Sequence, residues 1–135
     1  MQKQSVETIL GALNRERVRY LVVGGLAVVA HGFVRFTADL DLVLDPERDS
    51  LRRAIKALFS AQHPATEIDL FVEPPFDFDR AYAKAVRLEV GAGVTATFVG
   101  REELIEMKRS AGRPQDLADL AGLEEGSDEE GATNG

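Results

Sequence analysis

Apolar residues recur along the chain with two different periods. Spacings of three and four residues predict amphipathic helices, whereas alternation or short apolar runs predict strands. Helices are expected over residues 4–16, 26–31, 51–59, 77–82, 101–110 and 115–123. Strands are expected over residues 18–23, 38–44, 67–72, 84–90 and 94–99. The pattern predicts an α/β (α+β) fold: a small mixed sheet with helices packed on one face and acidic residues exposed near an edge of the other.

The first predicted strand ends in two glycines. Residues 18–23 run directly into Gly24 and Gly25, and a short helix follows. A strand that ends in this way presents bare backbone N–H groups, and the positive end of the helix, to an anion. Taken alone, the glycine pair is more typical of a simple turn. It gains meaning from the second predicted strand, whose first aspartate, Asp39, follows Gly25 after 13 intervening residues.

The second predicted strand carries two carboxylates on one face. Alternation puts Asp39 and Asp41 on the same side, with leucines on the other. An unpaired charge in a buried strand costs several kcal/mol, and a divalent metal would compensate for it. Mg²⁺ takes oxygen ligands and is commonly shared with substrate phosphates. Such pairs are also frequent by chance, so the glycine pair upstream strengthens the interpretation: phosphate and metal would meet at one site.

A third carboxylate, Asp69, lies in the next predicted strand. If the two strands are neighbours, Asp69 would complete the metal site or accept the proton of an attacking hydroxyl. The alternative is an acid at a strand end that faces water. A rival pair, Asp77 and Asp79, follows two prolines and precedes a predicted helix, so helix capping explains it better than metal binding.

Length and composition favour one compact unit. The 135 residues predict a single domain over residues 1–123, followed by a disordered acidic tail over residues 124–135. The net charge is −7, but five of the 23 acids and none of the 16 bases follow Leu123, so an anionic ligand is not excluded. The chain has no cysteine, which suits the cytoplasm, and no apolar segment long enough to span a membrane.

Three segments carry a resemblance to a known family: VGGLAVVAHGFVRFTADLDLVL, EIDLFV and REELIEMKRSAGRPQDLADL. The pattern of two glycines, about a dozen residues and D-x-D resembles the nucleotidyltransferase superfamily of DNA polymerase beta type. The match is closer to small prokaryotic members: abortive-infection AbiEii proteins, type IV toxin–antitoxin proteins and minimal nucleotidyltransferases. The resemblance implies a fold like the polymerase-beta palm. It covers most of the chain between residues 22 and 120.

The resemblance also implies roles for individual residues. Asp39 and Asp41 would bind two Mg²⁺ ions, which Mn²⁺ could replace, and Asp69 would be a further ligand or the base. The nucleotide would be bound by residues from three segments: Gly24, Gly25, Arg35, Thr37, Lys108 and Arg113. Lys108 and Arg113 are equally explained as the cationic end of a helix. Gln115 stands where the family usually has a lysine, so no role is carried over to it.

The expected activity is metal-dependent transfer of a nucleoside monophosphate from a nucleoside triphosphate to a hydroxyl. The acceptor could be a protein, a tRNA or a small molecule such as an aminoglycoside, in a toxin–antitoxin or phage-defence setting. The chain lacks the helical domain with which larger relatives hold an acceptor, which favours a cognate toxin or antitoxin partner or a homodimer. The alternatives are a non-catalytic, antitoxin-like or nucleotide-binding module that acts through a protein partner, and a degenerate relative without a ligand.

Overall fold

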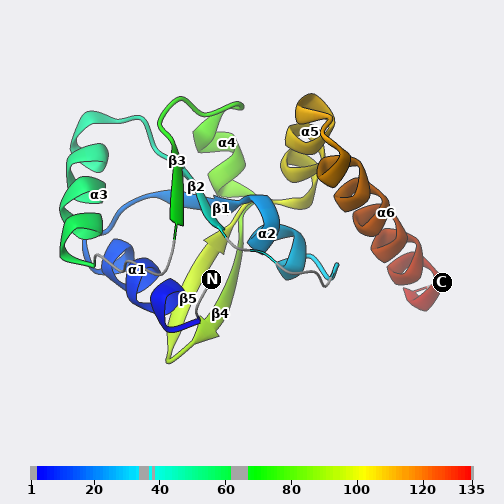
Figure 1. Ribbon diagram of the computed structural model, residues 1–135, viewed down its shortest axis with the longest axis horizontal. Coiled ribbons are helices and arrows are strands. Elements are labelled where there is room, and N and C mark those ends of the chain that lie inside the picture. Colours follow the sequence, from blue (N-terminus) through cyan, green and yellow to red (C-terminus); the bar gives the residue numbers. More distant parts are fainter. Residues whose placement is uncertain (1–2, 34–36, 38, 62–66, 135) are drawn as a thin grey trace.

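A computed structural model describes residues 3–33, 37, 39–61 and 67–134. This part of the chain forms a five-stranded mixed sheet with six helices (Figure 1). The strands are β1 (Tyr20–Val23), β2 (Asp39–Leu44), β3 (Glu67–Phe71), β4 (Val86–Gly91) and β5 (Val94–Phe98). The helices are α1 (Lys3–Arg15), α2 (Gly24–Ala30), α3 (Arg48–Ser60), α4 (Phe78–Ala83), α5 (Arg101–Ala111) and α6 (Pro114–Asn134). None of the helices described is both long enough and apolar enough to cross a membrane.

The strand order is β3-β2-β1-β5-β4. Strand β2 lies antiparallel to β1 and parallel to β3, and β5 joins the other side of β1. The register is specific: Asp41 lies opposite Val23 on one neighbour and opposite Asp69 on the other. The sheet therefore brings the end of β1, where the glycines follow, and the acids of β2 and β3 to one place.

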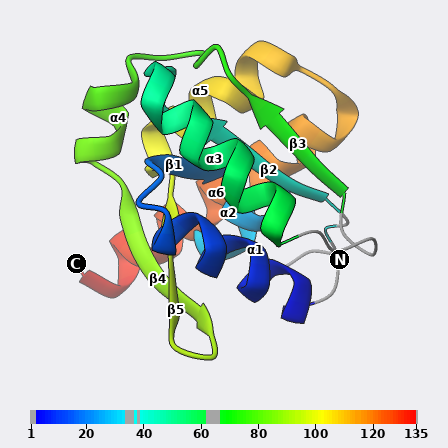
Figure 2. The same ribbon diagram turned by 90° about the vertical axis from the view of Figure 1, so that its left-hand side faces the viewer.

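The alternation in β2 divides the sheet into two faces. Leu40 and Leu42 are fully buried in the core, whereas Asp39 and Asp41 point to the other side and are partly exposed. Helices α1 and α3 cover the leucine face, as Figure 2 shows from their side. Helices α2, α5 and α6 lie behind the sheet in that view. The α/β class and the mixed sheet are confirmed, with helices on both sides rather than on one. The central strand β1 is buried along its whole length and needs apolar cover on both faces.

Helix α6 continues past Leu123, where the sequence led us to expect its end, and reaches Asn134. No proline follows residue 114, and glutamate is a good helix former. The first half of α6 is docked: Leu123 is buried, and a side chain at Gly122 would overlap the ring of Phe33. Figure 1 shows the second half extending away from the sheet. The end of the helix was thus misplaced, while the division into a domain and an acidic tail stays a prediction.

Candidate functional site

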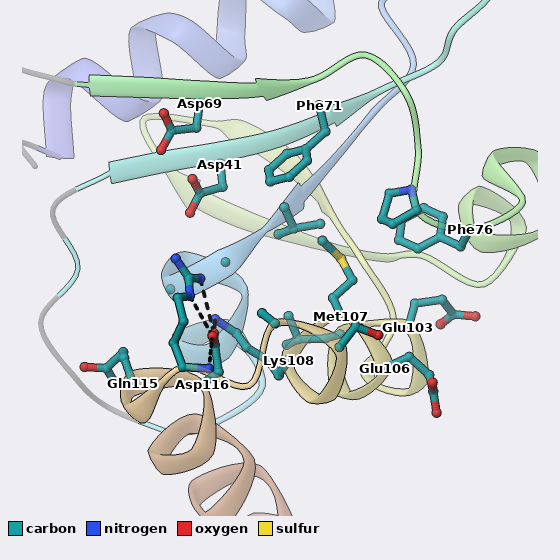
Figure 3. Close-up of a pocket in the computed structure, with 18 of the residues that line it drawn as sticks. Asp41, Asp69, Phe71, Phe76, Glu103, Glu106, Met107, Lys108, Gln115 and Asp116 are labelled. Atoms are coloured by element: carbon teal, nitrogen blue, oxygen red, sulfur yellow. Dashed lines mark hydrogen bonds and ion pairs between the residues drawn. The ribbon is translucent and has the colours of Figure 1, made fainter.

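Four carboxylates meet on two neighbouring strands. In the parallel register of β2 and β3, Asp41 lies opposite Asp69 and Asp39 lies opposite Glu67. Side chains directly opposite one another on adjacent strands share a face. Figure 3 shows Asp41 and Asp69 side by side above the cleft between the sheet and helices α5 and α6. The neighbourhood that a joint role of Asp69 and the β2 acids requires is therefore present.

The surroundings of Asp41 disfavour the charged form of its carboxyl group. Burial, the hydrogen bond with Asp69 and the negative charges of Asp69 and Asp39 together raise the pKa of Asp41 to about 6. Lys108, on the opposite wall of the cleft, acts in the other direction. A cation placed beside the Asp41 carboxylate would offset the effects that raise its pKa.

Glu67 is a member of this group that sequence reasoning missed. Its side chain is exposed, and the hydrogen bond with Asp39 and the charges of Asp39 and Asp69 raise its pKa. The signal was available in the sequence, because Glu67 and Asp69 repeat the alternating spacing of Asp39 and Asp41.

The donor set suits a magnesium ion shared with a ligand. Among the described residues, no group of three or more acidic or histidine side chains encloses a metal position by itself. Mg²⁺ is usually bound through one or two carboxylates together with waters and substrate phosphates. Asp41, with Asp39 or Asp69 beside it, could supply one or two of these ligands, and a metal ion at this position stays a prediction.

Gly24 is placed against Asp41. It has φ +68°, in the left-handed region that side chains disfavour. A Cβ atom built on Gly24 would overlap Oδ2 of Asp41 and lie 2.8 Å from its Cγ. The first glycine of the pair is thus needed to let the carboxylate lie against the backbone at the start of α2. Gly25 follows in the first turn and also lines the cleft. Contact of either glycine with phosphates stays a prediction.

We expect Gly24→Ala to lower the melting temperature by a few degrees more than Gly32→Ala does, because the new methyl group must also push the Asp41 carboxylate out of place. The measurement is a thermal melt of both variants. Gly32→Ala is the matched control: Gly32 also has positive φ (102°), but its Cβ would meet nothing within 4 Å. Equal losses of stability in the two variants would contradict the contact between Gly24 and Asp41, because backbone strain alone would then explain both.

The opposite wall of the cleft is built on a buried ion-pair network between α5 and α6. The ammonium group of Lys108 lies 3.3 Å from Oδ1 of Asp116 and 3.0 Å from Oδ2 of Asp119. All three side chains are buried. Gln115 donates a hydrogen bond to Asp119 at 3.0 Å. Sequence reasoning missed both aspartates as site residues, although both lie in the segment REELIEMKRSAGRPQDLADL that carries part of the family resemblance.

Arg113 is the exposed cation of this wall. Its Nε donates to Oδ2 of Asp116 at 2.7 Å, and a second guanidinium nitrogen donates to Oδ1 at 3.3 Å. These bonds raise the pKa of Arg113, and the charge of Asp41 adds to the effect. The side chain is nevertheless 74% exposed. Lys108 thus has its charge matched by two buried acids, whereas Arg113 is held in place with one side open to a ligand.

Of the remaining residues considered from the sequence, Thr37 lies at the cleft and Asp77 and Asp79 have local roles elsewhere. Thr37 lines the cleft, and its hydroxyl donates to the backbone carbonyl of Asp39 at 3.4 Å. Arg35 lies outside the described residues. The rival pair, Asp77 and Asp79, makes local contacts. Asp77 caps α4 by accepting a hydrogen bond from the backbone N–H of Arg80 at 3.2 Å. Asp79 forms an ion pair with Arg19 at 3.0 Å.

The cleft has a volume of about 1360 Å³ and two chemically different ends. At one end the acids of β2 and β3 face Lys108 and Arg113. At the other end Phe71, Phe76 and Met107 form an apolar surface (Figure 3). The volume exceeds the range typical of small-molecule sites and accommodates a nucleotide with room for a second reactant.

Comparisons with known proteins agree with this geometry. A family model described as "Nucleotidyltransferase of unknown function (DUF6036)" matches residues 3–124. Among solved structures, an antigenic nucleotidyltransferase-like protein from Paracoccidioides brasiliensis is similar, with a TM-score of 0.68 and 17% identity. The match covers 90% of this chain and 74% of that one, and at this identity it concerns the fold alone. No curated protein matches the chain. The superfamily suggested by the sequence is confirmed.

Proposed function

Because the chain belongs to the family of nucleotidyltransferases whose model matches residues 3–124, we propose that it transfers a nucleoside monophosphate from a nucleoside triphosphate to a hydroxyl group, with Mg²⁺ as cofactor. The observation that carries the proposal is the register that sets Asp41 beside Asp69, across a cleft from Arg113. Carboxylates on one wall and an exposed guanidinium on the other are suited to a metal-bound triphosphate. Mn²⁺ has similar preferences for ligands and is expected to substitute.

We propose one role for each residue of the site. Asp39 and Asp41 would hold Mg²⁺, and the ion would supply neutralisation of the charge that accumulates on the leaving pyrophosphate. Asp69 accepts the proton of the acceptor hydroxyl, whose oxygen bonds to the α-phosphorus while the bond to the bridging oxygen of pyrophosphate breaks. Arg113 binds phosphate oxygens through the side of its guanidinium that faces away from Asp116. Most of the acceleration comes from holding these groups in line.

Transfer of a radioactive label tests the proposal. The protein is incubated with Mg²⁺, each α-labelled nucleoside triphosphate, bulk tRNA and the protein encoded beside it. Asp39→Ala and Asp41→Ala should reduce labelling at least a thousandfold, whereas Asp77→Ala, the capping acid of α4, should retain it. Binding of the neighbouring protein that is unchanged by these substitutions, without any labelling, would instead support a non-catalytic module acting through a toxin or antitoxin partner.

We expect Arg113→Ala to raise the KM for the nucleoside triphosphate about tenfold, because one charge-assisted contact to phosphate is lost. Its melting temperature should stay close to that of the unaltered chain, since the side chain is 74% exposed and Asp116 keeps its bond to Lys108. Arg109→Ala is the matched control, as Arg109 lies in the last turn of α5, four residues before Arg113, and is 59% exposed. An unchanged KM in Arg113→Ala would remove Arg113 from the nucleotide site.

A further inference from the structure

Strand β3 is an edge strand. It pairs with β2 on one side, and no strand in the described part of the chain pairs with its other side. Backbone N–H and C=O groups along such an edge are a template for another extended segment. Proteins usually blunt an open edge with charged side chains, especially lysine, or with proline or a bulge. Between Glu67 and Phe71 there is no lysine or proline, and the pairing with β2 is regular. The charges that β3 does carry, on Glu67 and Asp69, would repel an acidic segment and attract a cationic one.

Large apolar side chains at the end of β3 are exposed to solvent. Leu70, Phe71 and Val72 are 43%, 40% and 50% exposed. Leu70 shares the face of Leu42 in β2, so the α1–α3 layer leaves the outer strand partly uncovered. Phe71 is on the opposite face and lines the cleft. The apolar surface of the edge is therefore continuous with the candidate active site.

The charge along this edge is negative. Glu67 and Asp69 lie on the cleft face of β3, and Glu103 and Glu106 lie on the other side of the cleft. A nucleic acid laid along β3 would bring its phosphates against Glu67 and Asp69, whereas a cationic segment would be attracted to them. A second copy paired through β3 would bring its own Glu67 and Asp69 close to those of the first. The edge is complementary to an extended polypeptide that is cationic and apolar.

We infer that the acceptor is a segment of another protein, which pairs in extended form with the free edge of β3 and presents a serine, threonine or tyrosine hydroxyl opposite Asp69. This inference rests on the proposed function, because it names the acceptor of that reaction. Paired strands are about 4.8 Å apart, and side chains directly opposite each other have Cβ atoms about 5 Å apart. The acceptor hydroxyl therefore arrives within reach of the Asp69 carboxylate without any movement of the sheet.

The same register defines the flanking positions of the acceptor. Residues two positions from the hydroxyl, on the cleft face, lie opposite Glu67 on one side and opposite Phe71 on the other. A lysine or arginine suits the first position and an apolar residue the second. In the reaction, the hydroxyl oxygen bonds to the α-phosphorus, its proton passes to Asp69, and pyrophosphate leaves. The product is a phosphodiester on the acceptor side chain.

A library of nine-residue peptides with central serine, threonine or tyrosine tests the inference. Binding is measured on Asp41→Asn, which prevents turnover, and labelling is measured on the unaltered chain with α-labelled nucleoside triphosphates. Selected peptides should carry lysine or arginine two residues from the hydroxyl. Methylating the backbone nitrogens that face β3 should weaken binding at least tenfold, whereas methylating the alternate nitrogens should not. Glu67→Gln should reduce the basic preference, and Glu89→Gln, on the edge strand β4, should leave it unchanged.

The outcomes separate this inference from the proposed function. Metal-dependent labelling of tRNA, or of peptides regardless of which nitrogens are methylated, would overturn β3 pairing while the transferase function stands. Peptide binding with the expected methylation pattern, but no labelling with any nucleotide, would retain the docking edge and overturn transfer. Failure of every peptide to bind would overturn the docking edge.

Discussion

Asp41→Asn should unfold at a higher temperature than the unaltered chain in EDTA at pH 7.5, while losing at least a thousandfold in transfer rate. The Asp41 carboxylate is half-buried beside Asp69 and Asp39, and its pKa is raised to about 6. Asparagine has the same shape without the charge. The gain in unfolding free energy should be on the order of 1 kcal/mol after solvent screening, or a few degrees in Tm.

The pH dependence of this gain has a defined sign. A carboxyl whose pKa is higher in the folded state favours the folded protein when protonated, so its contribution is complete below the unfolded value of 3.8 and is lost as pH rises through about 6. The difference in unfolding free energy between Asp41→Asn and the unaltered chain should therefore be largest above pH 7 and vanish near pH 4. Denaturant melts at a series of pH values measure it.

Magnesium should reverse the order of the melting temperatures of the unaltered chain and Asp41→Asn. At pH 7.5, 10 mM Mg²⁺ is expected to raise the Tm of the unaltered chain, because the ion stabilises the ionised carboxylates, and to leave Asp41→Asn almost unchanged. Asp77→Asn is the control, since this acid is outside the cleft. If Asp41→Asn melts below the unaltered chain in EDTA, or if Mg²⁺ raises the melting temperatures of both equally, the repulsion between Asp41 and its neighbouring carboxylates is absent.

Lys108→Met is expected to lower the unfolding free energy by about 3–5 kcal/mol, because it leaves Asp116 and Asp119 buried without their shared cation. Arg113 still pairs with Asp116, so the larger part of the loss is expected from the missing ion pair between Lys108 and Asp119. The effect should appear in urea melts as a lower midpoint with an unchanged slope. A loss of activity in this variant would then follow from loosening of the α5–α6 wall.

Lys84→Met is the matched control. Lys84 pairs with Glu102 at 3.4 Å and also with Glu103, but its side chain is 45% exposed. Exposed pairs contribute roughly 0–1 kcal/mol, so this variant should melt close to the unaltered chain. If Lys108→Met also melts there but raises the KM for the nucleotide tenfold, Lys108 binds substrate directly and the structural assignment is wrong.

The sequence predicted the strands and the acidic residues on them better than it predicted which strands and side chains lie beside one another. Alternation in β2 assigned Leu40 to the core and Asp41 to the other face, because a strand has only two faces. It could not show that β3 pairs with β2 in the register that joins Asp41 to Asp69, since strand order depends on packing across the whole sheet. From the sequence, the closeness of Asp69 to Asp41 could be stated only on the condition that the two strands are neighbours.

The second wall of the cleft was the least predictable part. Lys108 was expected to contact the nucleotide, or to be a simple helix-end cation. In the structure it pairs with the acids of α6, because helix–helix packing brings Asp116 and Asp119 over it, and its contact with a nucleotide stays a prediction. Opposite charges eight and eleven residues away carry no periodic signal across a helix break. Burial of a lysine is likewise invisible in a pattern that counts it as polar.

The contact between Gly24 and Asp41 also has a use for comparing relatives. Any side chain at position 24 would occupy the space of the Asp41 carboxylate, so the two positions cannot vary independently. A homologue that keeps the aspartate but replaces this glycine must hold its carboxylate elsewhere. One that has lost the aspartate is released from the constraint and is free to accumulate larger residues at position 24. The pair therefore distinguishes relatives that retain this arrangement from those in which the site has decayed.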